Sequence, residues 1–131
     1  MVGEPNLIDQ PGTREYAWDS WPGLRQLPEV DPRMWPSVVV VAAHPDDEVL
    51  GVGGTISILA AAGARVRLVA VTDGEASHPG ADPVAVARTR AAETAAALDL
   101  LGAPGIEVTR LGFPDTGLAA CEQQLSAVLR E

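Results

Sequence analysis

The sequence predicts an α/β domain of three layers, in which helices cover both faces of a mostly parallel β-sheet. Apolar runs of strand length recur along the chain, and a segment with helical periodicity follows each of them. Loops that contain glycine or proline separate these segments. Strands that alternate with helices of ten or more residues indicate right-handed crossovers between parallel strands. Residues 37–131 are therefore expected to form one domain.

The predicted strands are the apolar segments 38–43, 65–72 and 106–111. In an open parallel sheet, ligands bind in the crevice at the carboxyl ends of the strands. The loops that begin at His44, Asp73 and Phe113 are thus the candidate binding loops.

A predicted helix follows each strand. The first helix is expected to end near Gly63, and its apolar stripe consists of Val49, Val52, Ile56 and Leu59. The second, 84–101, is the longest, and Gly102 is expected to stop it. The third covers 118–129, and its apolar stripe consists of Leu118, Cys121, Leu125 and Val128. Cys121 is therefore expected in the core, and the lack of a strand after this helix suggests a truncated sheet.

The first 36 residues have a different composition. They hold six of the 11 prolines and all three tryptophans, without sustained periodicity. We expect an arm that packs onto the domain through its aromatic residues, with one short helix near 13–20.

Composition excludes several functions. A net charge of −9, with nine arginines and no lysine, argues against nucleic acid or an anionic membrane surface as a partner. The single cysteine excludes an internal disulfide and a multi-cysteine zinc site. No apolar run reaches the roughly 18 to 20 residues of a membrane span, and the N-terminus does not resemble a signal peptide. A soluble cytoplasmic protein is expected.

The hexapeptide "AHPDDE" at 43–48 places one histidine and three carboxylates at the end of the first strand. His44 and Asp47 are three apart, so they project from the same side of a helix start, whereas Asp46 points elsewhere. An imidazole and a carboxylate on one side make two ligands for zinc or another divalent cation. Asp46 could then accept a proton from a metal-activated water. The alternative is an ordinary helix N-cap.

Four ordered motifs resemble a known family. They are "VVVVAAHPDDEVLGVGGTI", "VRLVAVTDGEASHPG", "RAAETAAALDLLG" and "LGFPDTGL". Together they are similar to the N-terminal half of the PIG-L/LmbE family of zinc-dependent N-acetylglucosaminide deacetylases. The resemblance implies a Rossmann-like fold and the hydrolysis of an acetamide on an N-acetylglucosamine-type sugar conjugate, which releases acetate and a free amine.

Carried over by position, the resemblance implies that His44 and Asp47 bind zinc and that Asp46 is the general base. It also implies that Arg90 and Asp115 contact polar groups of the substrate. Two alternatives stay open: Arg90 could pair with Glu93 on the helix surface, and Asp115 could shape a turn.

The family's third zinc ligand is a histidine in a downstream "HxDH" motif, and this chain ends before any such motif. The remaining histidine, His78, lies in the loop after the second strand, where a solvated residue is the simpler interpretation. The missing ligand implies a truncated domain, or a complementing chain or homo-oligomer. Activity of the isolated chain is left open, and the rival interpretation is a non-catalytic fold that binds a sugar or a protein.

Overall fold

The computed structural model describes residues 11–130, and the chain divides into two compact units, Met1–Asp31 and Pro32–Glu131. The described part of the first unit holds two short helices, α1 (Glu15–Asp19) and α2 (Pro22–Arg25). Helix α1 confirms the short helix expected near 13–20. The rings of Trp18 and Trp21 pack edge to face, with centroids 6.1 Å apart. Residues 1–10 of the predicted arm lie outside the described residues, and its docking on the domain stays a prediction.

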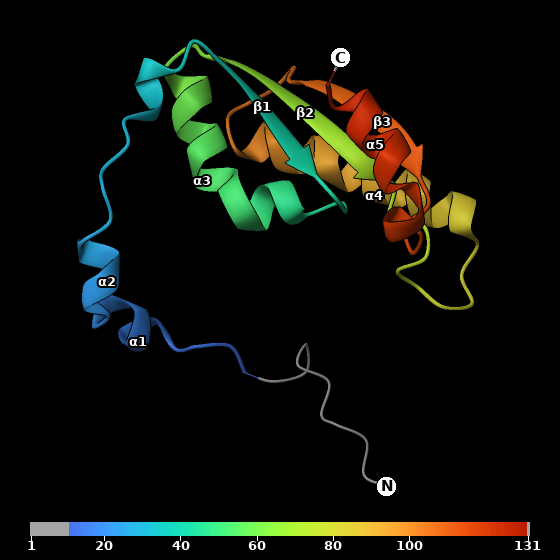
Figure 1. The fold of residues 1–131 in the computed structure, drawn as a ribbon, viewed down its shortest axis with the longest axis horizontal. Helices are drawn as coiled ribbons and strands as arrows, with labels where there is room; N and C mark the ends of the chain where they lie inside the picture. The colour runs from blue at the N-terminus through green and yellow to red at the C-terminus, as the bar shows by residue number, and fades with distance from the viewer. Residues whose placement is uncertain (1–10, 131) are drawn as a thin grey trace, which may run out of the picture. The chain divides into compact units, whose positions relative to one another are not determined.

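The second unit is built around a parallel sheet of three strands in the order β1-β2-β3 (Figure 1). Its elements in chain order are η2 (Pro32–Met34), β1 (Ser37–Ala42), α3 (Asp47–Ala61), β2 (Arg65–Thr72), α4 (Pro83–Leu100), β3 (Glu107–Phe113), η3 (Leu118–Cys121) and α5 (Glu122–Val128). The alternation of strands and helices confirms the predicted α/β class. The 3₁₀ helix η2 contacts α3 and belongs to this unit.

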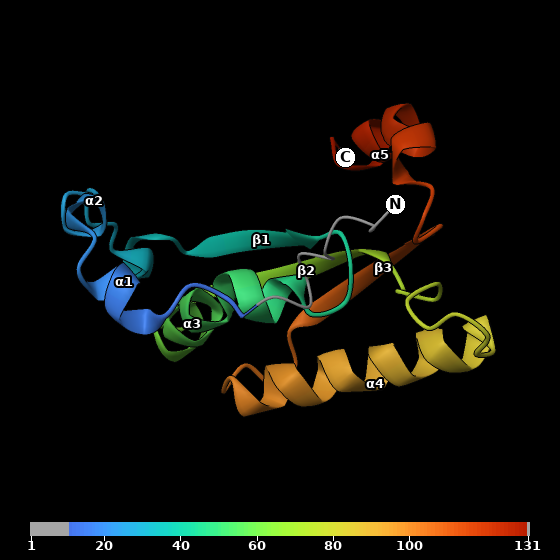
Figure 2. The same ribbon diagram turned by 90° about the horizontal axis from the view of Figure 1, so that it is seen from below.

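One face of the sheet packs against α3 and α4 (Figure 2). In register, Val40 of β1 lies beside Leu68 of β2, and Leu68 lies beside Val108 of β3. The buried cluster between sheet and helices consists of Ala42, Ile56, Leu68, Leu98 and Ala103. Removing such side chains from water stabilises a fold by about 25 cal/mol per Å² of apolar surface. This core fixes the end of β1 against the start of α3.

Both crossovers reach the same face of the sheet. The strand order never reverses, and right-handed crossovers between successive strands then fall on one side. Helix α5 lies on the other side of the sheet from α4 (Figure 2). Val39 and Val41 point to this second face and are 55% and 50% exposed.

The predicted helix over 118–129 is a 3₁₀ turn, η3, followed by α5. Neither of these elements contains a buried residue. Cys121 is half-buried, so its predicted place in the core was wrong. The apolar side chains of this segment have the right spacing for packing, but no packed layer lies against them in the part of the chain that the structure describes.

The end of β3 departs from regular pairing. Ala70 pairs with Arg110, but Thr72 pairs with Phe113, so β3 carries one residue more than β2 over this stretch. Gly112 lies in the bulge with a φ of 65°, a conformation that glycine adopts without steric cost. The bulge sets the direction in which the chain leaves β3 toward Asp115.

Among the described helices, none is both long enough and apolar enough to cross a membrane.

Candidate active site at the carboxyl ends of the strands

The candidate site begins where the chain leaves β1. The carbonyl of Ala43 accepts hydrogen bonds from the backbone N–H of Thr72, at 3.2 Å, and from its hydroxyl, at 2.9 Å. Thr72 is completely buried at the end of β2. Because water cannot reach this contact, the two donors hold the peptide that precedes His44 in place.

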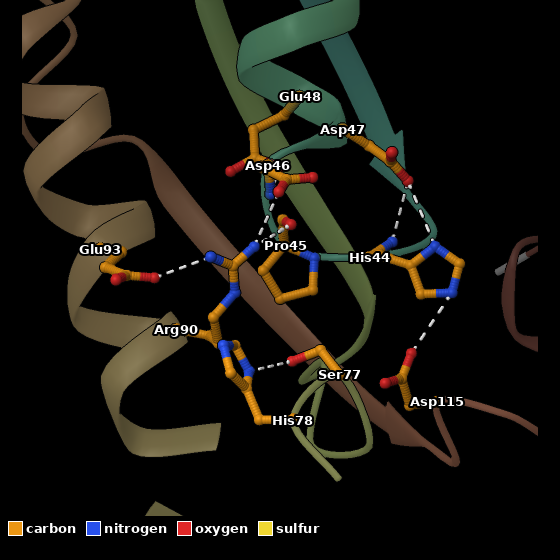
Figure 3. Close-up of polar contacts among 10 residues, drawn as sticks. All are labelled: His44, Pro45, Asp46, Asp47, Glu48, Ser77, His78, Arg90, Glu93 and Asp115. Atoms are coloured by element: carbon orange, nitrogen blue, oxygen red, sulfur yellow. Dashed lines mark hydrogen bonds and ion pairs between the residues drawn. The ribbon is translucent and has the colours of Figure 1, made fainter. Parts of the chain in front are cut away.

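His44 and Asp47 lie together in this loop (Figure 3). The backbone N–H of His44 donates to Asp47 Oδ2 at 3.0 Å, and the ring nitrogen Nδ1 lies 3.6 Å from the same oxygen. Asp46 points toward α4 instead. The predicted outcome is confirmed, since His44 and Asp47 share a side and Asp46 is turned away. The predicted reason was wrong, because α3 begins only at Asp47 and His44 lies in the loop before it.

Asp115 approaches the other edge of the His44 ring. Its Oδ1 lies 3.3 Å from His44 Nε2, and its side chain is only 10% exposed. The carboxylate is held by the backbone N–H of Ala76, at 3.0 Å from Oδ2, and the N–H of Asp115 donates to Glu75 Oε1 at 2.9 Å. The loops after β2 and β3 thus meet at Asp115, and the Asp115 carboxylate reaches the imidazole of the loop after β1. The alternative that Asp115 shapes the local backbone is supported by these contacts, and its contact with substrate stays a prediction.

Asp46 has a left-handed backbone, with φ 95° and ψ −23°. It occupies the N-cap position of α3, but its side chain makes no capping hydrogen bond. The ordinary N-cap interpretation is therefore wrong for this residue. A non-glycine residue in this conformation costs about 1 to 3 kcal/mol and persists only when its surroundings hold it there.

Arg90 of α4 holds the loop from the opposite side. One guanidinium nitrogen donates to the carbonyl of Pro45 at 2.7 Å and to Asp46 Oδ2 at 2.8 Å, and the other donates to Glu93 Oε2 at 2.9 Å. The predicted pair with Glu93 is thus present. The hydrogen bond to Asp46 raises the pKa of Arg90, burial of the guanidinium opposes this rise, and Glu93 adds to it. Arg90 remains a cation at any ordinary pH.

Glu48 was not singled out from the sequence, although it belongs to the same hexapeptide. It is 2% exposed, and its Oε2 accepts the backbone N–H of Asp46 at 3.2 Å. Its other oxygen, Oε1, has no hydrogen-bond partner among the described residues. A cavity of about 250 Å³ lies beside it, between the start of α3 and α4, and is also lined by Asp46 and Arg90. Thr72 was missed likewise, because a threonine at the end of an apolar strand carries no distinctive signal.

Only two of the expected metal ligands come together. Within residues 11–130, no group of three or more histidine, cysteine or acidic side chains has the geometry of a metal site. The Nδ1 of His78 lies 2.9 Å from the hydroxyl of Ser77, and both side chains are exposed. The structure therefore does not place His78 as the third ligand.

Comparisons with known proteins agree with this arrangement. A family model described as PIG-L, GlcNAc-PI de-N-acetylase, matches residues 39–131. The 1D-myo-inositol 2-acetamido-2-deoxy-alpha-D-glucopyranoside deacetylase of Segniliparus rotundus is 40% identical over 101 residues. That match covers 65% of this chain and 32% of the relative, so the chain spans about a third of that relative's length.

Two solved structures resemble the chain. An N,N'-diacetylchitobiose deacetylase from Pyrococcus horikoshii, complexed with its inhibitor MPG, matches with a TM-score of 0.64 and 27% identity. The match covers 93% of this chain and 48% of the deacetylase. The 4-carboxy-2-hydroxymuconate hydratase GalB from Pseudomonas putida matches with a TM-score of 0.57 and 26% identity, over 72% of this chain and 42% of the hydratase.

Proposed function

Because this chain belongs to the PIG-L family, we propose that it serves in the zinc-dependent removal of acetyl from an N-acetylglucosamine-type sugar conjugate. The observation that carries the proposal is the pairing of His44 with Asp47 at the carboxyl end of β1, with Asp46 turned toward Arg90 beside it. The deacetylases among its relatives support the same reaction. The partner would be a small-molecule amino sugar, and the expected location is the cytoplasm.

The donor set of the site fits a divalent ion. Zinc binds imidazole nitrogen and carboxylate oxygen at about 2.0 to 2.2 Å, so two ligands of one ion are at most about 4.4 Å apart. His44 Nδ1 and Asp47 Oδ2, at 3.6 Å, meet this condition. A histidine ligand commonly donates its second N–H to a carboxylate, and Asp115 is in place to accept it from Nε2. The described side chains supply these two ligands, and a catalytic zinc site usually has a third.

When bound, the ion would lower the pKa of a water molecule and polarise the acetamide carbonyl. The residues of the chain would supply the rest. His44 and Asp47 would hold the ion, Asp115 would fix the His44 ring, and Asp46 would accept a proton from the water that attacks the acetamide. The Asp46 side chain is 54% exposed, so water can reach it.

Arg90 and Asp115 are proposed to bind the sugar. The guanidinium of Arg90 already bonds to Asp46, Glu93 and the Pro45 carbonyl. A substrate hydroxyl or phosphate would replace one of these partners, which would leave the other contacts to orient the group. Asp115 would offer the sugar the second lone pair of Oδ1, the oxygen that also faces His44 Nε2.

A second candidate function is a non-catalytic domain that binds a sugar or a protein. It is favoured by the observation that only two ligand side chains meet in the described part of the chain. Two protein ligands hold zinc weakly compared with the three of a catalytic site.

Metal content of the purified chain after equilibration with micromolar zinc tests the proposal, beside His44→Ala and Asp47→Ala. About one ion per chain, lost in both variants but kept in Glu122→Gln on α5, is expected. Acetate release from N-acetylglucosamine conjugates is then compared between the wild type and Asp46→Asn. Loss of turnover with retained sugar binding supports the enzyme, and no acetate at any zinc concentration rejects it for this chain in favour of the binding domain.

A further inference from the structure

We propose that Glu48 is a positioning residue, whose buried carboxylate holds Asp46 in its left-handed conformation by accepting a hydrogen bond from the backbone N–H of Asp46. The inference rests on the proposed function only because that function makes Asp46 the general base. It assigns to Glu48 a task separate from metal binding, since its carboxylate faces Asp46 and not the pair of His44 and Asp47.

The conformation of Asp46 needs such support. Among the described residues it is the one non-glycine residue with a positive φ. A side chain with a Cβ atom rarely adopts this conformation unless several contacts fix it. A relaxed backbone at this position would redirect both the Asp46 carboxylate and the start of α3.

Three sets of contacts hold Asp46. Its carbonyl accepts the N–H groups of Val49 and Leu50, which belong to the first turn of α3. Arg90 donates to its carboxylate and to the preceding carbonyl. Its own N–H is bound by Glu48 Oε2. Glu48 is 2% exposed, but a cavity lies beside this contact, so removal of the carboxylate would open the N–H of Asp46 to water.

Burial of Glu48 is unfavourable for stability alone. A buried carboxylate loses its hydration, and Oε1 gains no hydrogen bond in return among the described residues. An apolar side chain of similar length would suit the same site between α3 and the sheet. The one contact that distinguishes a glutamate here is the acceptor it offers to the N–H of Asp46.

Amide hydrogen exchange, followed residue by residue by NMR, tests the proposal in the full chain without metal or substrate. Glu48→Met keeps the volume and removes the acceptor, whereas Glu48→Gln keeps a carbonyl acceptor and removes the charge. Glu107→Gln is the control, because it removes an exposed carboxylate of β3 that pairs with Arg67, away from Asp46 and Arg90. Position 48 does not adjoin the Asp46 amide in sequence, so these substitutions leave its intrinsic exchange rate unchanged.

In Glu48→Met, protection of the Asp46 amide should fall at least about tenfold relative to the amide of Leu68, which reports global opening. Glu48→Gln should stay within about threefold of the wild type, and Glu107→Gln should match the wild type. Unchanged protection in Glu48→Met, or a Gln variant as unprotected as the Met variant, would overturn the inference. If Glu48→Met does not fold, the wild type alone is measured, and an Asp46 amide without protection there would also overturn the inference.

These outcomes are distinct from failure of the proposed function. If Asp46→Asn keeps full turnover, Asp46 is not the base, but the exchange result still decides whether Glu48 holds its backbone. If exchange shows no effect of Glu48, the assignment of Asp46 as the base is still tested by acetate release.

Discussion

The carboxylate of Asp115, from the loop after β3, lies 3.3 Å from Nε2 of His44, in the loop after β1. The two loops are brought together because β1 and β3 flank β2 in a parallel sheet and end at the same edge. A bulge at Gly112 turns the chain just before Asp115. The contact links the loop after β1 to Asp115, at which the loops after β2 and β3 meet.

Replacing Asp115 with alanine should weaken zinc binding by about 10- to 100-fold, because the His44 ring loses the group that orients it. Asp115→Asn keeps a hydrogen-bond acceptor and should lose less. Competition with a chromophoric chelator measures both affinities. Glu107→Gln, an exposed residue paired with Arg67 on the sheet, is the control for lost charge. Equal affinity in Asp115→Ala and the wild type would show that Asp115 does not act on the metal ligand.

Thr72→Val should destabilise the domain by about 0.5 to 1.5 kcal/mol, because the Ala43 carbonyl loses its hydroxyl donor and keeps only the backbone N–H of residue 72. Urea unfolding of the purified chain measures the change. Thr109→Val, at an exposed position of β3, is the matched substitution and should stay within about 0.5 kcal/mol. Similar values for the two variants would mean that the hydroxyl of Thr72 does not hold the loop.

Gly74→Ala should lower the stability of the domain for two reasons, backbone strain and overpacking. Gly74 has a φ of 65°, and a Cβ atom there would lie 3.0 Å from Pro45 Cδ, so Pro45 would have to shift. Gly80 has a φ of 85° with no atom within 4 Å of such a Cβ. We expect about 1 to 2 kcal/mol of lost stability for Gly80→Ala from backbone strain alone. Gly74→Ala should lose a further amount of about 1 to 3 kcal/mol from overpacking. Thermal or urea unfolding gives both values, and a Gly74 variant no worse than the Gly80 variant would exclude the clash.

Leu98→Ala should cost about 2 to 5 kcal/mol, because it opens a cavity between α4 and the sheet. Leu100, two residues further along α4, is 89% exposed, and its substitution by alanine should change the free energy of unfolding by less than about 0.5 kcal/mol. Denaturant unfolding separates the two. A small effect at Leu98 would contradict the assignment of this face of α4 to the core.

Local patterns predicted the elements of the sheet closely. Segment 65–72 coincides with β2, and the helix expected over 84–101 is α4, displaced by one residue at each end. Strand and helix periods are properties of neighbouring residues, so they can be recognised without knowledge of packing. The third strand is longer than expected, because its pairing continues past the bulge at Gly112.

Tertiary packing decided whether the last helix and Cys121 are buried. An apolar stripe over 118–129 predicts that some face is buried, but it does not specify which layer lies against that face. In the described residues no such layer covers α5, and its apolar residues stay partly exposed. The position of a single cysteine on such a stripe therefore could not establish burial.

The sequence by itself determined the α/β class, the approximate positions of the strands and the shared side of His44 and Asp47, because these are properties of residues close together in the chain. Only the tertiary structure decided that Asp115 reaches His44, that Arg90 pairs with Asp46, and that Glu48 is buried beneath the Asp46 backbone. The first two contacts join residues far apart in the chain, and they depend on strand register and on the placement of α4. The third depends on a left-handed backbone that local propensity disfavours, and it exists because surrounding contacts outweigh that preference.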